Sequence, residues 1–314
     1  MNIVFIVKGT SRSKRKTIKA IASIKSSGLF KEVQIWHTEY AGQAISLASK
    51  ACGQFDYLIA VGGDGTLNEV VNGCLQVKVH NEEGKPQKLI PIIGVLPQGT
   101  ANDFIKTISI TGKADELLEL IKSESHSKVD IGQISYCNEN GSMEKRYFLN
   151  IASVGIGANV VQCVNKSKKY LGANLTFLLA IVRTFLSYQP RALSVESNDF
   201  CWQGEALTLA IANGRYFGSG LCIAPHAKVN DGLFGITLLG QVSVKDFVMK
   251  FGQLKKGVMI KHPEVIYQQA SFIEVTSSSP DCAVEADGEF LGFSPIRIEI
   301  LPGELSFLMP SKAG

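Results

Sequence analysis

The sequence lacks an apolar run long enough to cross a bilayer. Its most apolar helix candidate, residues 175–186 (LTFLLAIVRTFL), is interrupted by Arg183 and falls short of the roughly 20 residues that a membrane span needs. The opening MNIVFIV is too short for the apolar core of a signal peptide, and its basic residues lie on the wrong side, so it predicts a first strand. We therefore expect a chain that does not span a membrane.

Cysteine and histidine patterns typical of disulfide scaffolds and zinc sites are also absent. The seven cysteines are an odd number, spread from Cys52 to Cys282 without a CxxC pair, and this favours free thiols in a reducing compartment. The five histidines are scattered without metal-ligand spacing. We therefore expect a cytoplasmic protein without a zinc centre.

The net charge of the whole chain is small, but basic residues are concentrated in one segment. The net charge of +4 is too small to indicate a nucleic-acid-binding protein. Residues 8–19 (KGTSRSKRKTIK) nevertheless contain six Lys or Arg and no acid. Two interpretations remain open for this segment: a solvated helix face, or a surface for phosphates or anionic lipid headgroups.

The order of apolar segments predicts two domains, as the length of 314 residues also suggests. Up to about residue 122, short apolar runs alternate with helical patterns, which indicates a parallel sheet covered by helices. From about residue 127 the chain is rich in β patterns and predicts a mostly antiparallel domain. Helical inserts are expected at about 158–188 and 243–256. In the first insert one face is shared by the apolar residues Leu175, Leu178, Leu179, Val182 and Leu186.

Residues 57–73 (YLIAVGGDGTLNEVVNG) predict a buried strand, a glycine-rich turn and a helix starting near Thr66. Three glycines let the backbone approach a ligand, and the free N–H groups of the helix start favour an anion such as phosphate. Asp64 would repel a bare phosphate but suits Mg²⁺ accompanying one. Neither a P-loop nor a G-x-G-x-x-G fingerprint occurs in the chain, so neither explains this turn.

A second polar turn follows the next predicted strand, in residues 92–104 (IIGVLPQGTANDF). Taken alone, its Thr, Asn and Asp residues favour an ordinary helix N-cap. Two such turns at adjacent strand ends favour instead the two walls of one phosphate-binding cleft.

These segments together resemble the diacylglycerol kinase catalytic domain family, particularly its bacterial soluble lipid kinases, which are also similar to sphingosine kinases. GGDGTLNEV and PQGTANDF carry the resemblance in the first domain, and residues 150–160, 211–239 and 284–290 extend it over nearly the whole chain. The resemblance implies an α/β domain (1–126), similar to those of phosphofructokinases and NAD kinases, and a β-sandwich (127–302). It further implies a nucleotide cleft between them and a return of residues 303–314 to the first domain.

The resemblance also implies which residues bind ATP. It assigns the nucleotide phosphates to Thr38, Gly62, Gly63, Asp64, Gly65, Thr66, Leu67, Asn68, Glu69, Gly99, Thr100, Asn102 and Asp103. The first loop departs from the family, because KGTSRSK stands where Asn-Pro-x-Ser-Gly is usual, and this puts nucleotide contacts from that loop in doubt.

A structural Mg²⁺ and a catalytic base are implied in the second domain. In similar enzymes main-chain oxygens and one aspartate hold the ion, which corresponds here to Lys228, Asp231 and Leu233, although DG alone would predict a plain turn. In CAVEADGEF, a predicted hairpin turn at residues 287–288, Glu289 is expected to accept the proton of the substrate hydroxyl. Asp287 is its partner or the base itself.

The function expected from the sequence is an ATP- and Mg²⁺-dependent lipid kinase that phosphorylates diacylglycerol at the membrane surface. Three alternatives stay open: another lipid acceptor such as a sphingoid base or phosphatidylglycerol, NAD as acceptor, or a non-catalytic nucleotide- or lipid-binding regulator. The expected partners are the lipid substrate and anionic headgroups, with the protein peripheral at the membrane and Lys166, Lys168 and Lys169 among the contacting residues. No nucleic-acid partner is expected, and a homodimer is left open.

Overall fold

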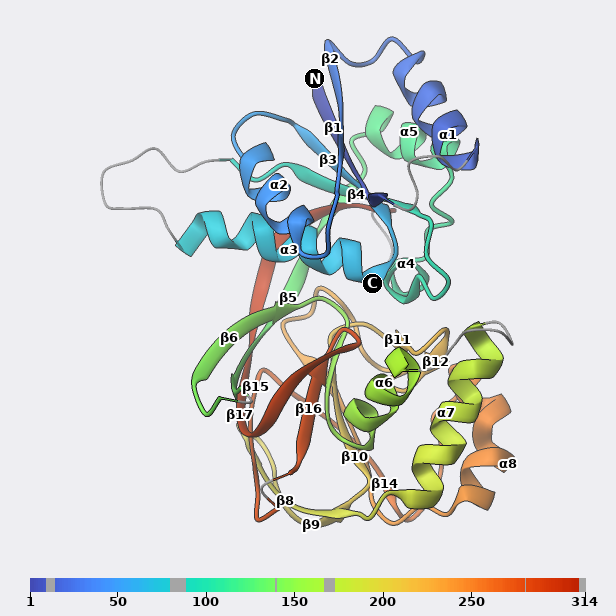
Figure 1. Cartoon of the computed structure of the whole chain (residues 1–314), viewed down its shortest axis with the longest axis vertical. Helices are drawn as coiled ribbons and strands as arrows, with labels where there is room; N and C mark the ends of the chain where they lie inside the picture. The colour runs from blue at the N-terminus through green and yellow to red at the C-terminus, as the bar shows by residue number, and fades with distance from the viewer. Residues whose placement is uncertain (10–14, 80–88, 139, 167–172, 280, 311–314) are drawn as a thin grey trace. The chain divides into compact units, whose positions relative to one another are not determined.

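The computed structural model describes residues 1–9, 15–79, 89–138, 140–166, 173–279 and 281–310 (Figure 1). Its contacts divide the chain into two units, Met1–Val129 with Gly303–Gly314, and Asp130–Pro302. The sequence placed this boundary after residue 126. The division instead falls inside a continuous strand, β5 (His126–Cys137), where a change in sequence pattern gives no signal.

A parallel sheet forms the centre of the first unit, as predicted. Its strand order is β17-β4-β3-β1-β2, and every pair in it is parallel. The strands are β1 (Asn2–Val7), β2 (Glu32–His37), β3 (Tyr57–Gly62), β4 (Ile92–Pro97) and the last residues of β17 (Glu289–Leu308). The central strands are continuous apolar runs because helices cover both faces of such a sheet, whereas no residue of the edge strand β2 is buried.

The helices of the first unit follow the predicted order with one difference at the glycine-rich turn. They are α1 (Arg15–Lys25), α2 (Gln43–Ala51), α3 (Asp64–Val79), α4 (Asp103–Thr107) and α5 (Ala114–Lys122). The prediction that α3 starts near Thr66 was wrong, because the helix begins at Asp64. A carboxylate is favoured in the first helical turn, where it interacts with the positive end of the helix dipole. Asp64 and Gly65 therefore belong to the helix rather than to the turn.

The chain returns to the first unit at its far end. Phe307 of β17 pairs in parallel with Ile93 of β4, and its ring lies 5.2 Å from that of Phe104. The Ser125 hydroxyl donates a hydrogen bond of 3.0 Å to the carbonyl of Met309. Residues 303–309 thus supply one strand and part of the core of this unit, while 311–314 lie outside the described residues.

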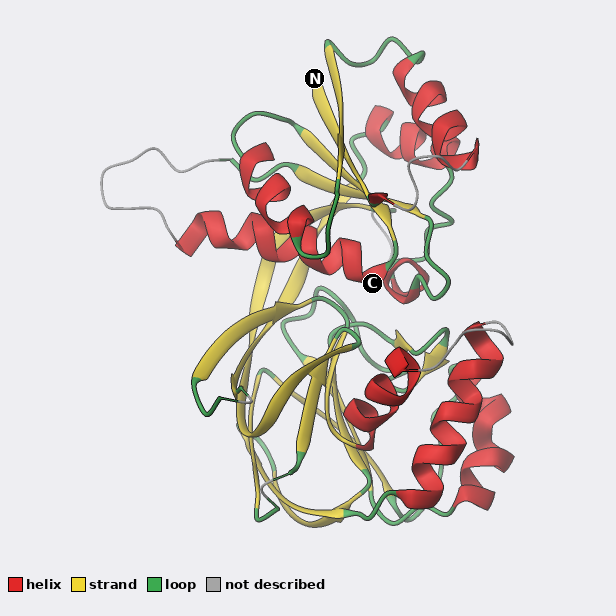
Figure 2. Ribbon diagram, viewed as in Figure 1, coloured by secondary structure: helices red, strands yellow, loops and turns green. Residues whose placement is uncertain are grey.

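The described residues of the second unit form antiparallel strands with helices packed against them (Figure 2), which confirms the predicted β-sandwich. Besides β5 and β17, its strands are β6 (Met143–Phe148), β7 (Ile151–Gly155), β8 (Arg191–Ser197), β9 (Cys201–Ala206), β10 (Thr208–Ala212), β11 (Tyr216–Phe217), β12 (Leu221–Cys222), β13 (Phe234–Leu239), β14 (Val265–Ala270), β15 (Phe272–Ser277) and β16 (Ala283–Ala286). The helices are α6 (Ile156–Lys166), α7 (Ala173–Ser187) and α8 (Val244–Lys255).

Helix α7 turns a different face inward from the one that the apolar pattern indicated. Ile181 is buried and Phe185 half-buried, whereas Leu179 and Leu186 are exposed. Because α7 is apolar almost all round, its pattern cannot select a face. Arg183 lies on the same side as the two exposed leucines, four residues after one and three before the other, and its charge keeps that side in water. The side chains of Leu175 and Leu178 lie outside the described residues.

Among the described residues, no helix is both long and apolar enough to span a bilayer.

Candidate active site

The two polar turns of the first unit touch through their glycines. The N–H groups of Gln98 and Gly99 donate to the carbonyl of Gly62 at 2.7 and 3.2 Å. A Cβ atom on Gly99 would lie 2.6 Å from the Cα of Gly63, which no side chain tolerates. Glycine at position 99 is therefore required by the close approach of the two backbones. The turns lie side by side, as expected for adjacent strand ends, while the phosphate-binding cleft between them stays a prediction.

Asp64 joins the start of α3 to the start of α4. Its Oδ1 accepts a hydrogen bond of 3.2 Å from the N–H of Phe104. Asn102, which precedes α4 with a φ of 47°, donates its side-chain amide to the carbonyl of Gly99 at 2.9 Å and does not cap the helix. The N-cap interpretation of the second turn is therefore wrong, because its polar side chain is used to shape the turn.

Gly65 differs from the other glycines of the turn. A Cβ atom on Gly62 would clash with Thr66, at 2.3 Å from its Oγ1, but one on Gly65 would meet no atom within 4 Å. Gly65 is exposed and lies in the first helical turn. The fold itself thus gives no reason for a glycine there, whereas a ligand close to the backbone does.

A hollow of about 490 Å³ lies beside this turn in the first unit. Its wall includes Thr38, whose Oγ1 accepts a hydrogen bond of 3.1 Å from the N–H of Gly9. Glu69, also in the wall, accepts from the N–H of Ala44 at 3.1 Å and is thereby held between α3 and α2. Lys8 is the cation among the described lining residues. The sequence placed it in the basic segment 8–19, with a phosphate surface as one of two open interpretations, and its place directly after β1, at the carboxyl end of the sheet, favours that one.

Other residues predicted to bind the nucleotide are engaged elsewhere. Leu67 is a core residue, 2% exposed, and its N–H donates to the carbonyl of Gly63. Asn68 is buried and accepts, through its side chain and its carbonyl, from the amide of Asn72. Asp103 is buried and forms an ion pair of 2.8 Å with Lys106. Thr100 is exposed on its turn and stays a candidate, as does the buried Thr66, which borders the hollow.

The predicted acidic hairpin is present in the second unit, and Asp287 is the residue that anchors it. Asp287 and Gly288 form the turn between β16 and β17, with positive φ values of 49° and 80°. The Asp287 carboxylate accepts backbone hydrogen bonds from Leu149, Asn150 and Ile151 at 2.8 to 3.1 Å. Both of its oxygens therefore hold the hairpin against the start of β7, which points to a positioning role.

Glu289 follows the turn and is more accessible. Its carboxylate forms an ion pair with Arg146 of β6 and is 44% exposed. Arg146 was not singled out in the sequence, because a single arginine in a strand carries no pattern of its own. Tyr136 lies nearby on β5, where burial, followed by a hydrogen bond to Glu144, raises its pKa to about 12.

Glu285 is the third acid of the hairpin, and no role was assigned to it from the sequence. It is buried, and its oxygens accept from the hydroxyl of Ser153 at 2.6 Å and from the N–H of Gly288 at 3.0 Å. Burial raises the pKa of this carboxyl to about 7, although the two hydrogen bonds lower it in part. Glu285 is thus a buried carboxyl group whose pKa is raised to about 7 by burial and whose oxygens are held by Ser153 and Gly288.

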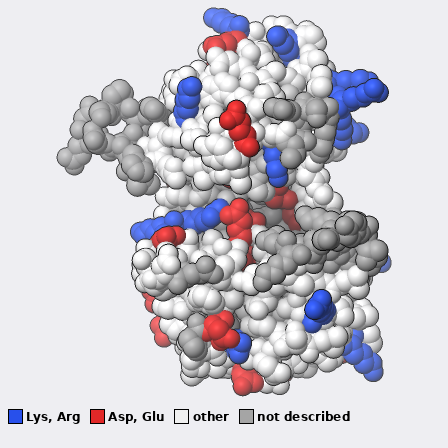
Figure 3. Space-filling view, viewed as in Figure 1, with Lys and Arg blue, Asp and Glu red and all other residues white. Residues whose placement is uncertain are grey.

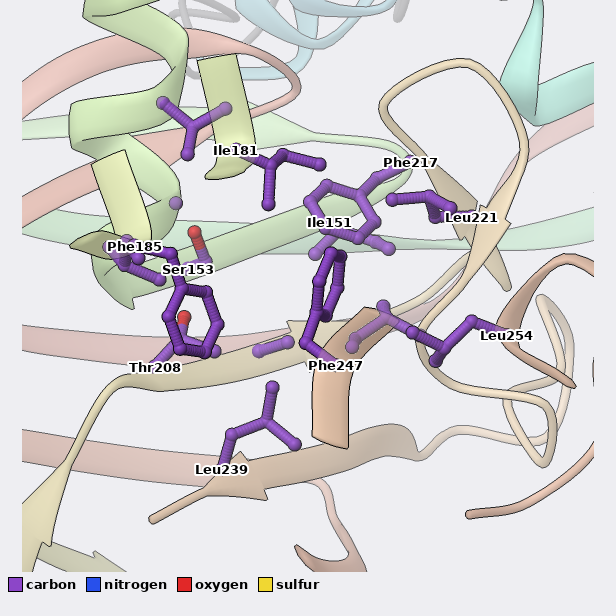
Figure 4. A pocket seen from close by; sticks show the side chains of 15 residues that line it. Ile151, Ser153, Ile181, Phe185, Thr208, Phe217, Leu221, Leu239, Phe247 and Leu254 are labelled. Atoms are coloured by element: carbon purple, nitrogen blue, oxygen red, sulfur yellow. The ribbon is translucent and has the colours of Figure 1, made fainter. Parts of the chain in front are cut away.

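An apolar cavity lies next to this pair, between the sheet of the second unit and its helices (Figure 4). The rings of Phe185, Phe217 and Phe247 surround it, and among the described lining residues only Ser153 and Thr208 are polar. The Thr208 hydroxyl donates to the carbonyl of Val154, whereas the Ser153 hydroxyl donates to the Glu285 carboxylate. Ser153 is therefore the residue that connects the cavity lining to Glu285. The cavity measures about 80 Å³, below the roughly 300 Å³ at which small-molecule pockets begin.

The residues predicted to hold a structural Mg²⁺ lie on one exposed loop of the second unit. The Asp231 carboxylate accepts a hydrogen bond of 3.1 Å from the N–H of Leu233. Between these two residues, the N–H of Gly232 donates to the buried carboxylate of Asp130 at 2.7 Å. Asp130 was missed in the sequence, where it is one polar residue in the strand pattern KVDIGQISY. No group of three or more His, Cys, Asp or Glu in the described parts of the chain is placed to hold a metal. A site of main-chain oxygens and one aspartate would not be such a group.

Two buried amide oxygens close to this loop lack a hydrogen-bond donor. Asn213 donates from its amide nitrogen to the carbonyls of Asp130 and Leu149, both at 2.8 Å, which leaves its Oδ1 without a partner. The Oδ1 of Asn150 is in the same state, and the two residues are joined because the Asn213 N–H donates to the carbonyl of Asn150. Oxygen donors of this kind fit a hard cation or an ordered water.

Family models of known proteins match the two units of the chain separately. Residues 2–134 match the family model of the diacylglycerol kinase catalytic domain, and residues 150–309 match that of the YegS C-terminal NAD kinase beta sandwich-like domain. The chain is 28% identical over 313 residues to the "Probable lipid kinase YegS-like" of Yersinia enterocolitica, covering 98% of this chain and 96% of the relative. It is 29% identical over 304 residues to a "Diacylglycerol kinase" of Staphylococcus aureus, covering 96% and 90%.

Solved structures share the fold. A crystal structure of a diacylglycerol kinase from Bacillus anthracis superposes with a TM-score of 0.73 at 19% identity, covering all of this chain and 98% of the other. Yeast NADH kinase in complex with NADH gives a TM-score of 0.53 at 11% identity, covering 98% and 82%. With both units matched in order along the chain, the protein belongs to the diacylglycerol kinase-like family of lipid kinases.

Proposed function

We propose that the protein transfers the γ-phosphoryl group of ATP to the free hydroxyl of diacylglycerol. The observation that carries this proposal is the apolar cavity of the second unit, whose lining suits a hydrocarbon chain and offers no set of polar groups for a nucleotide acceptor. The cavity is smaller than an acyl chain, so entry of lipid requires the surrounding helices to move apart. The matches to the family support a lipid acceptor but do not choose among lipids.

The first unit supplies the groups for ATP. The open space at Gly65 and the N–H groups at the start of α3 suit phosphate oxygens, and Lys8 and Thr38 line the adjoining hollow. Asp64, a carboxylate held at the same helix start, is the residue that would bind Mg²⁺ accompanying the phosphates. When bound, that ion neutralises charge on the transferring group.

The second unit supplies the proton acceptor. Glu289 is accessible, and its ion pair with Arg146 holds the carboxylate in place on the hairpin. As the lipid hydroxyl oxygen forms its bond to the γ-phosphorus, its proton passes to the Glu289 carboxylate and the bond to ADP breaks. Asp287 positions the hairpin through its three backbone hydrogen bonds. Such a base contributes roughly 10² to 10⁴ in rate.

Radiolabelled ATP with a lipid extract, and with NAD in a separate reaction, tests the acceptor. Label in the organic phase that co-migrates with phosphatidic acid supports the proposal. A different labelled lipid would show that the acceptor is a lipid other than diacylglycerol. A labelled NAD product in the aqueous phase would indicate the NAD kinase alternative. Nucleotide binding without any transfer would indicate a regulator.

The base is tested by Glu289→Gln, which should lower kcat by about 10² to 10⁴ while ATP affinity stays nearly unchanged, because in this mechanism the residue acts on the acceptor and not on the nucleotide. Glu274→Gln is a matched control, since Glu274 is a strand glutamate of the same unit, paired with Arg297 and 43% exposed. Its kcat should equal that of the wild type. If Glu289→Gln keeps full kcat, the proton acceptor lies elsewhere.

A further inference from the structure

Helix α8 has apolar side chains on two opposite faces. Phe247 and Leu254 turn inward and line the cavity. Val248 and Met249 point to solvent, and Met249 is 61% exposed. A helix on the surface of a soluble protein needs only one apolar stripe, so the outward one is not explained by the core.

The outward stripe continues past the end of the helix. Lys245, Val248, Met249, Gly252 and Lys256 recur at spacings of three and four residues, which places them on one side of α8. The chain then folds back, with the N–H of residue 258 donating to the carbonyl of residue 253 at 3.1 Å. We call the following residues the α8 surface: Lys245, Val248, Met249, Lys255, Lys256, Val258, Met259 and Lys261, all of them exposed.

The charge around this apolar stripe has one sign. Residues 244–261 contain five lysines and one acid, Asp246. That acid is already engaged at the start of the helix, where it bonds to the hydroxyl of Ser243 and lies 3.9 Å from His262. The exposed valines and methionines are thus bordered by basic side chains, and the single acid of residues 244–261 is engaged by Ser243 and His262.

Helix α7, which packs beside α8, also carries exposed apolar side chains together with a basic one. The two helices pack through the rings of Phe185 and Phe247, whose centres are 5.6 Å apart. On its own outward side α7 carries the exposed Leu179 and Leu186 with Arg183 between them, and the helix contains no acid. Over α7 and α8, the charged side chains visible in Figure 3 are all basic.

We propose that the α8 surface docks onto an anionic lipid bilayer, with its apolar side chains entering the boundary of the acyl region and its lysines at the headgroups. Long basic side chains reach headgroups while their stems and apolar neighbours lie deeper, which is the composition of interfacial helices. The same helix lines the apolar cavity with its other face, so docking brings bilayer and cavity to opposite sides of one helix. This inference deepens the proposed function by giving the route of its lipid substrate.

Lysines favour a bilayer over a second copy of this chain as the occupant. In a symmetric dimer through this surface, the four lysines of one copy would face the same four of the other without acids of the surface to pair them. An anionic membrane instead supplies negative charge over the whole area, and each lysine near it strengthens binding by about fivefold.

The test measures vesicle binding of the purified chain without ATP, so that it stands apart from kinase activity. Vesicles of phosphatidylcholine mixed with phosphatidylglycerol are compared with vesicles of phosphatidylcholine alone in flotation assays. Met249→Ser should weaken binding to the anionic vesicles by about tenfold, through lost apolar contact. Met143→Ser, at an equally exposed methionine (62%) of strand β6, should leave it unchanged.

Lys256→Gln should weaken binding by about fivefold at low salt and by less at high salt. Lys122→Gln, at the exposed end of α5, is its control and should have no effect. Absence of binding to anionic vesicles, or equal losses in variants and controls, would overturn the proposal. So would a dimer that Met249→Ser converts to monomer with vesicle binding unchanged. If the acceptor assay fails while the variants behave as expected, only the proposed reaction is lost.

Discussion

Replacing Glu285 by glutamine should remove a specific pH dependence of stability. Burial raises the pKa of this carboxyl to about 7 in the folded protein, from an ordinary value of 4.5. Between these two values the folded state binds more protons at this site than the unfolded state, so the free energy of unfolding falls as pH rises. The stabilisation is fully present below pH 4.5 and is lost as pH passes through 7.

Glu285 loses about 2.5 kcal/mol of stabilisation between pH 5 and pH 8, from the shift in its pKa and about 1.4 kcal/mol per unit. Glutamine has nearly the same shape and does not titrate. Its altered hydrogen bonding to Ser153 and Gly288 adds a cost that is the same at every pH. The difference in stability between variant and wild type should therefore shift by this amount in favour of the variant as pH rises.

Urea unfolding followed by fluorescence at several pH values between 5 and 8 measures this difference. Glu274→Gln, the same substitution at an exposed glutamate of the same unit, serves as control. A difference for Glu285→Gln that is flat over the range, or that moves in favour of the wild type as pH rises, would refute a neutral, buried carboxyl at this position.

Two further predictions concern the first unit. Asp64→Asn should abolish phosphoryl transfer with little change in melting temperature, since asparagine can still accept from the N–H of Phe104; wild-type turnover in radiolabelled ATP assays would contradict the role of the charge. Gly73→Ala should destabilise the fold by about 1–3 kcal/mol, because its Cβ would lie 2.2 Å from the carbonyl of Ile45. Gly65→Ala, whose added Cβ would have no atom within 4 Å, should leave the free energy of unfolding unchanged but weaken ATP binding measured by calorimetry. Equal effects of the two substitutions on the free energy of unfolding would contradict the view that Gly73 is needed for packing and Gly65 for the ligand.

The order of strands and helices in the first unit was readable from sequence because local signals agree there. Buried parallel strands are apolar runs, and each glycine-rich turn marks the end of one. The meeting of the turns also followed, since adjacent parallel strands end at one edge of the sheet. What the sequence could not give was the division of roles within a turn, such as the engagement of Asp103 with Lys106.

The acids of the hairpin show a limit of strand alternation. A period of two would place Glu285, Asp287 and Glu289 on one side. The register between β16 and β17 shifts at residues 284 and 285, and the turn intervenes before Glu289, so the three carboxylates have three different environments. Neither a bulge nor the burial of one glutamate leaves a trace in residue types alone.

Helix α7 illustrates the same limit for helices. A nearly continuous apolar segment carries no information about which side is covered, and the inward side is set by the aromatic contacts with α8. The exposed leucines that result became visible only in the structure.

Strand β17 has a consequence for the order of folding. Because residues 303–308 complete the sheet beside β4, the backbone edge of β4 has no partner until that late segment has been synthesised. Contacts between residues so far apart in the chain form slowly, and an unpaired apolar strand edge can pair with other chains in the meantime. During translation the parallel sheet of the first unit therefore stays incomplete until residues 303–308 have been made, and the open edge of β4 can pair with other chains in this interval.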